Sequence, residues 1–221
     1  PSLALRRHYR SRDATEGMFG IGWSFEWEAE CLSSRDAAGN RFVNVRLGNG
    51  ERLEFRKAAD GSFSGGDPRS FGLTADGTEL LLRPRTGGSL RFDAAGRLSA
   101  VEDRSGNRLT VSRDPAGRIA TLTDASGRQL SFAYTAANKV ATVTDPAGRV
   151  FSYRYSSAGE LAAASDPAGH TTRYLYDAQQ RLSSVIGPDG LEWTANRYDA
   201  AGRVVSQAVA GEVWRYQYDV P

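Results

Sequence analysis

The sequence predicts an all-β protein made of repeated antiparallel hairpins, and three observations carry that prediction. Turn residues recur with a constant period, the turns share one chemical pattern, and apolar side chains occupy matching positions between them. Glycine is frequent, with 24 residues among 221, and no stretch longer than two turns shows the apolar spacing of a helix. A chain of this length is sufficient for one large domain or two small ones, with a buried core.

Two series of turn residues define the period. The first series runs through Gly96, Gly117, Asn138, Gly159, Gln180 and Gly202, at intervals of 21 and a last interval of 22. The second runs through Gly106, Gly127, Gly148, Gly169, Gly190 and Gly211, always at intervals of 21. Together they place a turn at every tenth or eleventh position over most of the array, so each repeat is one hairpin whose strands keep about six residues, or about 20 Å. Because open twisted sheets of ten or more strands rarely stay flat, we expect a curved sheet.

The turns carry a specific signature, seen most clearly in three segments of the form Asp-Pro-Ala-Gly at 114–117, 145–148 and 166–169. Aspartate at the first position accepts hydrogen bonds from the turn backbone, proline sets φ at the second, and glycine accepts positive φ at the fourth. This pattern is typical of a type I turn followed by a left-handed residue, a common hairpin closure. We therefore predict structural turn roles for Asp93, Gly96, Asp114, Gly117, Asp124, Gly127, Asp145, Gly148, Asp166, Gly169, Asp199 and Gly202.

Side chains between the turns form one-sided rows. One aliphatic row runs through Leu98, Ile119, Val140, Leu161 and Leu182, with Val204 following after a one-residue insertion. The alternate strands predict an aromatic ladder of Phe132, Phe151, Tyr153, Tyr155, Tyr174, Tyr176, Trp193, Trp214 and Tyr216. Residues two apart in a strand share a face, so one face is aromatic and aliphatic while the other holds small and polar residues such as Ser131 and Ser152.

The chain divides into a less regular region, residues 1–90, and a repeat array, residues 91–221, with about six repeats of which the last is truncated. In the first region we expect strands over 3–9, 23–31, 41–47, 51–57 and 79–83, a tight hairpin at Gly48-Asn49-Gly50, and a loop or weak hairpin over 58–77. The absence of an initial Met and the unfinished turn at the end suggest a segment of a longer protein.

The segments Tyr176-Asp177-Ala-Gln-Gln-Arg181-Leu182 and Tyr198-Asp199-Ala-Ala-Gly202-Arg203-Val204 resemble the YD repeat, Tyr-Asp-x-x-Gly-Arg-Leu. This repeat is found in bacterial Rhs proteins, in the C subunits of insecticidal toxin complexes and in teneurins. The motif Phe19, Gly20, Gly22 and Trp23, in Phe-Gly-Ile-Gly-Trp-Ser, together with Tyr9-Arg-Ser-Arg, resembles the segment that precedes the repeats in bacterial Rhs cores. The resemblance covers nearly the whole chain.

The resemblance implies a long β-ribbon that spirals into a hollow shell, of which this chain is an early part of the wall. In bacterial members the shell encloses a C-terminal toxin domain until delivery, often by a type VI secretion system. The implied partners are therefore the remainder of the shell and its toxin domain, with type VI secretion components as possible further partners. Such a protein is made in the bacterial cytoplasm and then secreted or delivered to target cells. No self-cleavage motif and no toxin domain are found in this sequence, which implies a structural protein and not an enzyme.

Composition narrows the other classes of function. Lys and Arg number 28 against 26 Asp and Glu, a net charge of +2 that argues against a nucleic-acid partner. No apolar run reaches the length of a membrane helix. The single cysteine, Cys31, excludes internal disulfides and multi-cysteine metal sites. We therefore expect no cofactor, no metal and no membrane span.

Repeated charged and aromatic residues allow alternative interpretations. The arginine after each turn glycine, as in Arg118 and Arg149, could line an anion-binding groove, but an ion pair with the aspartate four residues earlier is favoured. The aspartates of successive repeats are about 10 Å apart by strand spacing, so they cannot share a calcium ion. The aromatic ladder could bind sugars, but cross-strand packing is favoured.

The remaining candidates for catalysis are few. His170 occupies a turn position where other repeats carry arginine, and His8 lies in an expected strand. Neither stands at a diagnostic spacing from a nucleophile, and Cys31 has no nearby histidine. We predict no catalytic residues. A glycan- or protein-binding module that uses the polar face, through Arg154 and Arg173, is the alternative function, and a hydrolase built on a carboxylate pair is a third hypothesis.

Overall fold

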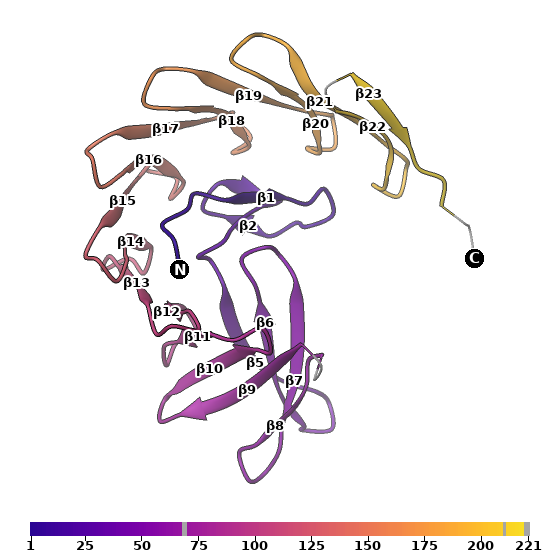
Figure 1. Cartoon of the computed structure of the whole chain (residues 1–221). Helices are drawn as coiled ribbons and strands as arrows, with labels where there is room; N and C mark the ends of the chain where they lie inside the picture. The colour runs from indigo at the N-terminus through magenta and orange to yellow at the C-terminus, as the bar shows by residue number, and fades with distance from the viewer. Residues whose placement is uncertain (68–69, 210, 219–221) are drawn as a thin grey trace. The chain divides into compact units, whose positions relative to one another are not determined.

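The computed structural model describes residues 1–67, 70–209 and 211–218. Within these ranges the regular structure is β throughout, with strands β1 to β23 and no helix (Figure 1), which confirms the all-β prediction. A helix with the length and hydropathy needed to cross a membrane is not found among the described residues.

The largest sheet has fifteen strands, and its neighbours follow chain order from β9 to β23. Its strands are β9 (Phe71–Asp76), β10 (Glu79–Pro84), β11 (Ser89–Phe92), β12 (Leu98–Glu102), β13 (Arg108–Arg113), β14 (Ile119–Thr123), β15 (Gln129–Tyr134), β16 (Val140–Thr144), β17 (Val150–Tyr155), β18 (Leu161–Ser165), β19 (Thr171–Tyr176), β20 (Leu182–Ile186), β21 (Glu192–Tyr198), β22 (Val204–Val209) and β23 (Glu212–Arg215). A chain-order sheet of antiparallel neighbours is a succession of hairpins, as the turn spacing predicts.

Three smaller sheets are formed by the strands that precede β9 in the chain. A four-stranded sheet has the order β5 (Glu30–Arg35), β6 (Arg41–Arg46), β7 (Arg52–Lys57) and β8 (Phe63–Gly65). The strand β1 (Arg7–Tyr9) pairs with β4 (Trp23–Phe25), and β2 (Glu16–Gly17) pairs with β3 (Gly20–Ile21).

The register of the hairpins repeats together with a bulge. Leu122 lies opposite Leu130, and Val143 lies opposite Phe151 one repeat later, so corresponding side chains share a face. The pairing shifts by one position just before the last residue of β13, β17, β19 and β21, immediately ahead of the turn. The extra residue lies near the start of the following strand, as Ala120 does between Ile119 and Thr121, and such a bulge increases the local twist of the sheet.

Two compact units make up the chain. The first unit contains residues 1–8 and 24–131, and the second contains residues 9–23 and 132–221. Large fully buried side chains of the first unit include Phe25, Phe55 and Phe92, and those of the second include Phe19 and Leu161. This division differs from the boundary at residue 90, which reflects the regularity of the repeats and stays a prediction.

The structure refines the expectations for residues 1–90. Strands β6, β7 and β10 lie where expected, and the Gly48-Asn49-Gly50 hairpin closes with a hydrogen bond from Gly50 N to Leu47 O. The expected strand over 23–31 is instead broken into β4 and β5, because Glu28 N–H donates to Phe25 O in a turn. The expected loop or weak hairpin over 58–77 contains two strands, β8 and β9. Strand β1 covers only the end of the range 3–9.

Candidate functional site

Each predicted turn aspartate begins a turn of one geometry. In the turn of Asp145, one carboxylate oxygen accepts hydrogen bonds from the backbone N–H groups of Ala147 and Arg149, each at 2.9 Å. The backbone closes with bonds from Gly148 N to Asp145 O and from Asp145 N to Arg149 O. Gly148 has a φ of +79°, a value that a side chain disfavours. The aspartate therefore satisfies backbone donors that the turn leaves unpaired.

The same backbone closure recurs at the other predicted turns. It joins Asp93 to Gly96, Asp114 to Gly117, Asp124 to Gly127, Asp166 to Gly169 and Asp199 to Gly202. The two residues that replace glycine in the series, Asn138 and Gln180, also have positive φ, at 59° and 60°. The turn therefore keeps its backbone conformation at these two positions although the residue is not glycine.

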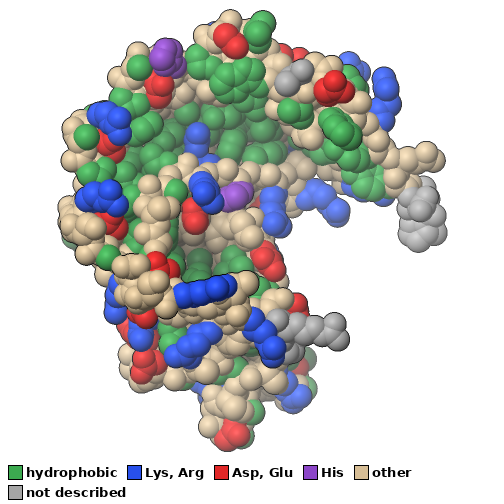
Figure 2. Space-filling view, in the orientation of Figure 1, with side chains coloured by type: hydrophobic (Ala, Val, Ile, Leu, Met, Phe, Trp, Pro, Cys, Tyr) green, Lys and Arg blue, Asp and Glu red, His purple; other side chains and the backbone are tan. Residues whose placement is uncertain are grey.

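The arginine that follows each turn is paired. Arg149 lies 2.6 Å from the Asp145 carboxylate, and Arg118, Arg128, Arg181 and Arg203 make the same pair with the aspartate four residues earlier. His170 takes this place beside Asp166. In Figure 2, acidic and basic side chains lie side by side at the turns of the hairpins. The ion-pair interpretation therefore holds, and these arginines do not form a free basic groove.

The tyrosine before each of the later turns bonds to the preceding hairpin. Its phenol donates to the backbone carbonyl of the residue that begins the previous aliphatic strand, at 2.7–2.9 Å. The pairs are Tyr155 with Val140, Tyr176 with Leu161, Tyr198 with Leu182 and Tyr218 with Val204. At this position in an earlier repeat, Arg113 donates to Leu98 O. We call this contact the tyrosine lock. The sequence predicted Tyr155 and Tyr176 on the aromatic ladder, but it did not predict the hydrogen bond or the equivalent roles of Tyr198 and Tyr218.

Arginine and tyrosine are also linked across neighbouring repeats. The Arg181 guanidinium lies 4.6 Å from the Tyr198 ring centroid, and Arg203 has the same distance to Tyr218. A guanidinium at this distance is attracted to the ring face. Tyrosine, aspartate and arginine of one repeat therefore act together, with the aspartate closing the turn and the other two joining adjacent hairpins.

The motif at residues 19–23 packs on the aromatic ladder of the second unit. The Phe19 ring lies 4.9 Å from the ring of Tyr153, and the Trp23 ring lies 5.2 Å from that of Tyr174, both edge to face. Trp23 Nε1–H donates to the Tyr176 hydroxyl at 2.9 Å. That hydroxyl in turn donates to Leu161 O, so the motif binds directly to one tyrosine lock.

Other groups fix the same N-terminal segment, residues 9–23, to the repeats. The Tyr9 hydroxyl accepts a hydrogen bond from Leu182 N at 2.8 Å, and Met18 O accepts one from Val140 N at 2.9 Å. The buried Lys139 ammonium, which stands where other repeats carry the turn arginine, pairs with Glu16. Backbone, aromatic and ionic contacts thus all hold this segment.

The two motif glycines are required by close approach. A Cβ on Gly20, whose φ is +100°, would lie 2.8 Å from the carbonyl oxygen of Gly159. A Cβ on Gly22, whose φ is +76°, would lie 2.9 Å from the ring of Tyr9. Both glycines let the segment lie against its neighbours at distances that other residues cannot reach.

The later residues of the predicted ladder lie differently. Tyr153 and Tyr174 are buried, with 7% and 9% of their surface exposed, whereas Trp193 and Trp214 are 43% and 58% exposed. Figure 2 shows hydrophobic side chains gathered over β17 to β20. The remaining ladder residues are Phe132 and Phe151, which are half-buried, and Tyr216, which is exposed.

The register corrects the place of Trp193 in the ladder. In β18 and β19 Ala164 lies opposite Thr172, and the next repeat continues with Val185 opposite Thr194 rather than Trp193. The bulge opposite Val185 and Ile186 takes up the one-residue insertion and leaves Trp193 without a partner residue on β20. Its indole N–H donates to Asp189.

Burial raises the pKa values of three tyrosine hydroxyls. Loss of solvent raises the pKa of Tyr198 to about 12 and raises the pKa values of Tyr9 and Tyr176 above the ordinary value of 10.0. The phenols therefore stay protonated and able to donate across the physiological range of pH. Tyr176 and Tyr198 donate to backbone carbonyls, and Tyr9 accepts from Leu182 N.

The structure gives the surroundings of Cys31 and His170, two residues considered above for reaction chemistry. Cys31 is buried, and loss of solvent raises the pKa of its thiol to about 12, which disfavours the reactive thiolate. His170 pairs with its turn aspartate. Among the described residues, no group of three or more His, Cys, Asp or Glu side chains is placed to hold a metal ion.

Comparison with known families agrees with this repeat geometry, which defines a tandem β-hairpin protein. The RHS repeat matches residues 92–129, 113–150, 134–171 and 155–192, and the starts of successive matches are spaced by the period of the turn series. Residues 1–55 match a domain of unknown function, DUF6531. Residues 92–192 therefore consist of tandem RHS repeats, which supports the resemblance to Rhs/YD-repeat proteins. No curated protein matches it.

Solved structures with similarity to this chain come from toxin complexes. The crystal structure of TcdB2-TccC3-Cdc42 matches with 15% identity and a TM-score of 0.44, covering 85% of this chain and 12% of that chain. The structure of the Photorhabdus luminescens Tc holotoxin pore, with a mutation in TccC3, matches with 16% identity and a TM-score of 0.43, covering 86% and 12%. The chain thus spans about 12% of the length of these chains, and the similarity is too distant to decide function.

Proposed function

We propose that residues 1–221 form a structural segment of the wall of a shell, and that this shell encloses a toxin domain of the same longer protein until delivery. The observation that carries the proposal is that the repeated polar side chains form their hydrogen bonds and ion pairs within the sheet. Asp145, Arg149 and Tyr176, and their counterparts, hold turns and join hairpins. Their hydrogen-bonding groups are engaged within the sheet, as a containing wall requires.

The N-terminal segment supports the same proposal. Residues 9–23 contribute Phe19 and Trp23 to one face of the repeats and cover Tyr153 and Tyr174. A second layer on a repeat sheet stiffens it, because each buried ring adds apolar area and a fixed geometry. Delivery by a type VI secretion system, synthesis in the bacterial cytoplasm and release to target cells stay predictions from the family resemblance.

Limited proteolysis of the full reading frame that encodes this chain tests the proposal. We expect a C-terminal domain that resists a protease while the repeats are intact and becomes sensitive at the denaturant concentration that unfolds them. The matched control is the same domain expressed without the repeats, which should be digested at once. Equal digestion of the domain with and without the repeats would contradict enclosure.

A binding module is the second candidate, and one observation favours it. Arg154 and Arg173 both lie opposite Ala163 on the polar face of β17 to β19, and both are exposed. This pair could contact an anionic cell-surface glycan or protein. Binding to a glycan array that disappears in the double variant R154Q/R173Q would support this candidate, and an array without signal would remove it.

A further inference from the structure

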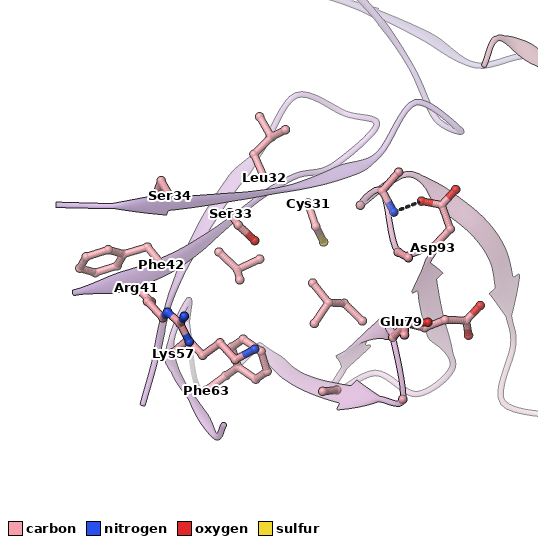
Figure 3. A pocket seen from close by; sticks show the side chains of 18 of the residues that line it. Cys31, Leu32, Ser33, Ser34, Arg41, Phe42, Lys57, Phe63, Glu79 and Asp93 are labelled. Carbon is pink, nitrogen blue, oxygen red and sulfur yellow. Dashed lines mark hydrogen bonds between the residues drawn. The ribbon is translucent and has the colours of Figure 1, made fainter. Parts of the chain in front are cut away.

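A pocket of about 930 Å³ is lined by residues of the first unit. One wall is the β5–β8 sheet, another is the β9–β10 hairpin, and the turn at Asp93 completes it. Figure 3 shows Arg41, Lys57 and Phe63 together at one end, with Glu79 and Asp93 at the other. The two kinds of charge are thus separated along the pocket.

Three cations form a row across the sheet at this pocket. Arg35 lies opposite Arg41, and Arg41 lies opposite Lys57, so the three are on one face of adjacent strands. Neighbouring strands are about 4.8 Å apart, so the row spans about 10 Å. Like charges directly opposite each other destabilise a sheet, and the fold itself gains nothing from this arrangement.

The acidic residues of the pocket are already paired with other partners. Glu79 lies 3.0 Å from Arg91, and the Asp93 carboxylate lies 3.2 Å from Arg97. In the part of the chain that the structure describes, neither the Arg35 nor the Arg41 side chain has a hydrogen bond or ion pair, and the Lys57 ammonium lies over the Phe63 ring, 5.5 Å from its centroid. The row thus differs from the turn arginines, which are neutralised.

We propose that this cation row binds an extended acidic segment of a partner protein, with carboxylates at alternate positions. Residues two apart in an extended chain point the same way and lie about 7 Å apart, so two such carboxylates fit within the row. Arginine binds carboxylates through paired hydrogen bonds, and Phe63, which lies opposite Lys57 and also lines the pocket, offers apolar contact to the stem of a glutamate side chain. An anionic glycan with one charge per disaccharide would leave part of the row unpaired.

Fluorescence anisotropy with the chain of residues 1–221 tests the proposal. The probe is a labelled peptide that alternates Glu and Ser, compared with a peptide in which Gln replaces Glu. We expect the Glu peptide to bind, the Gln peptide not to bind, and the double variant R41Q/K57Q to weaken binding by about tenfold or more. The matched control, R56Q/R108Q, removes the same charge at two exposed positions outside the row and should bind as the parent does.

Because R41Q/K57Q relieves repulsion, its thermal midpoint should equal or exceed that of the parent, which separates lost binding from lost folding. If R41Q/K57Q does not fold, R35Q provides the same test with one charge removed. Equal binding of the two peptides, unchanged binding by a folded R41Q/K57Q, or an equal loss in R56Q/R108Q would overturn the proposal. A heparin oligosaccharide that binds the row more tightly than the Glu peptide would also overturn it.

Discussion

Two parts of the second unit share one repeat chemistry but differ in burial. In β16 to β20 the aromatic side chains lie under residues 9–23, and Tyr153 and Tyr174 are buried. In β21 to β23 the turn of Asp199 and the locks of Tyr198 and Tyr218 persist, but Trp214 is exposed. The repeat therefore builds hairpins by itself, whereas burial of its apolar face depends on a second layer.

Replacement of Trp23 by alanine should have the largest effect on this comparison. The variant W23A loses a buried indole, its ring contact with Tyr174 and the donor to Tyr176, so we expect the free energy of unfolding to fall by about 3–5 kcal/mol. The control W214A removes an exposed indole and should change it by about 0.5 kcal/mol or less. Urea denaturation measures both, and equal losses would contradict the difference between the two parts.

Replacement of Gly20 by alanine tests the close approach of the segment. The new Cβ would meet the Gly159 carbonyl at positive φ, and we expect a loss of about 2 kcal/mol or more. The matched variant G148A has positive φ but no atom within 4 Å of its Cβ, so it should lose only about 1 kcal/mol. Thermal unfolding ranks the two, and a larger loss in G148A would refute a tight contact at Gly20.

Replacement of Tyr176 by phenylalanine isolates the lock. The Leu161 carbonyl and the Trp23 indole N–H both lose their partner, so we expect a loss of about 1–3 kcal/mol. The variant Y216F changes an exposed phenol and serves as the control. If chemical denaturation finds Y176F as stable as Y216F, the lock contributes nothing.

Lowering the pH should destabilise the turns over a defined range of pH. A hydrogen bond from the Arg149 side chain holds the pKa of Asp145 below 3.8, and one from the Asn107 side chain lowers the pKa of Asp103 to about 2. Because both pKa values are lowered in the folded state, the two carboxylates contribute fully to the free energy of unfolding above pH 3.8. This contribution is lost as the pH falls towards 2. Unfolding followed by circular dichroism should show this loss, and it should be shallower in D145N. A stability that is flat from pH 5 to pH 2 would argue against it.

The turns could be predicted from the sequence because each is determined by a short local segment. The stretch from Asp145 to Arg149 contains the acceptor, the positive-φ residue and the ion-pair partner. The hydrogen bond of the tyrosine lock joins positions about 15 apart in neighbouring hairpins, and the position of the tyrosine alone does not reveal it.

The packing of residues 9–23 could not be predicted, because Phe19 and Trp23 carry no period that points to the repeats. Gly20 and Gly22, beside these large apolar residues, indicate that the backbone lies close to another part of the chain. They do not indicate which part. The last interval of the first turn series is one residue longer than the others, which indicates an inserted residue. The interval does not indicate which strand contains that residue, so the spacing predicts Trp193 on the aromatic ladder and misses the bulge beside it. The cation row depends on the register of β5 to β7, which residue spacing alone did not establish.

A double-mutant cycle of W23F and Y176F tests most directly the claim that the N-terminal segment is held by the lock of a repeat. Each variant removes one side of the hydrogen bond from Trp23 Nε1 to the Tyr176 hydroxyl while keeping an aromatic ring. The account predicts a coupling of about 1 kcal/mol in the free energy of unfolding. Strictly additive effects of the two replacements would contradict it.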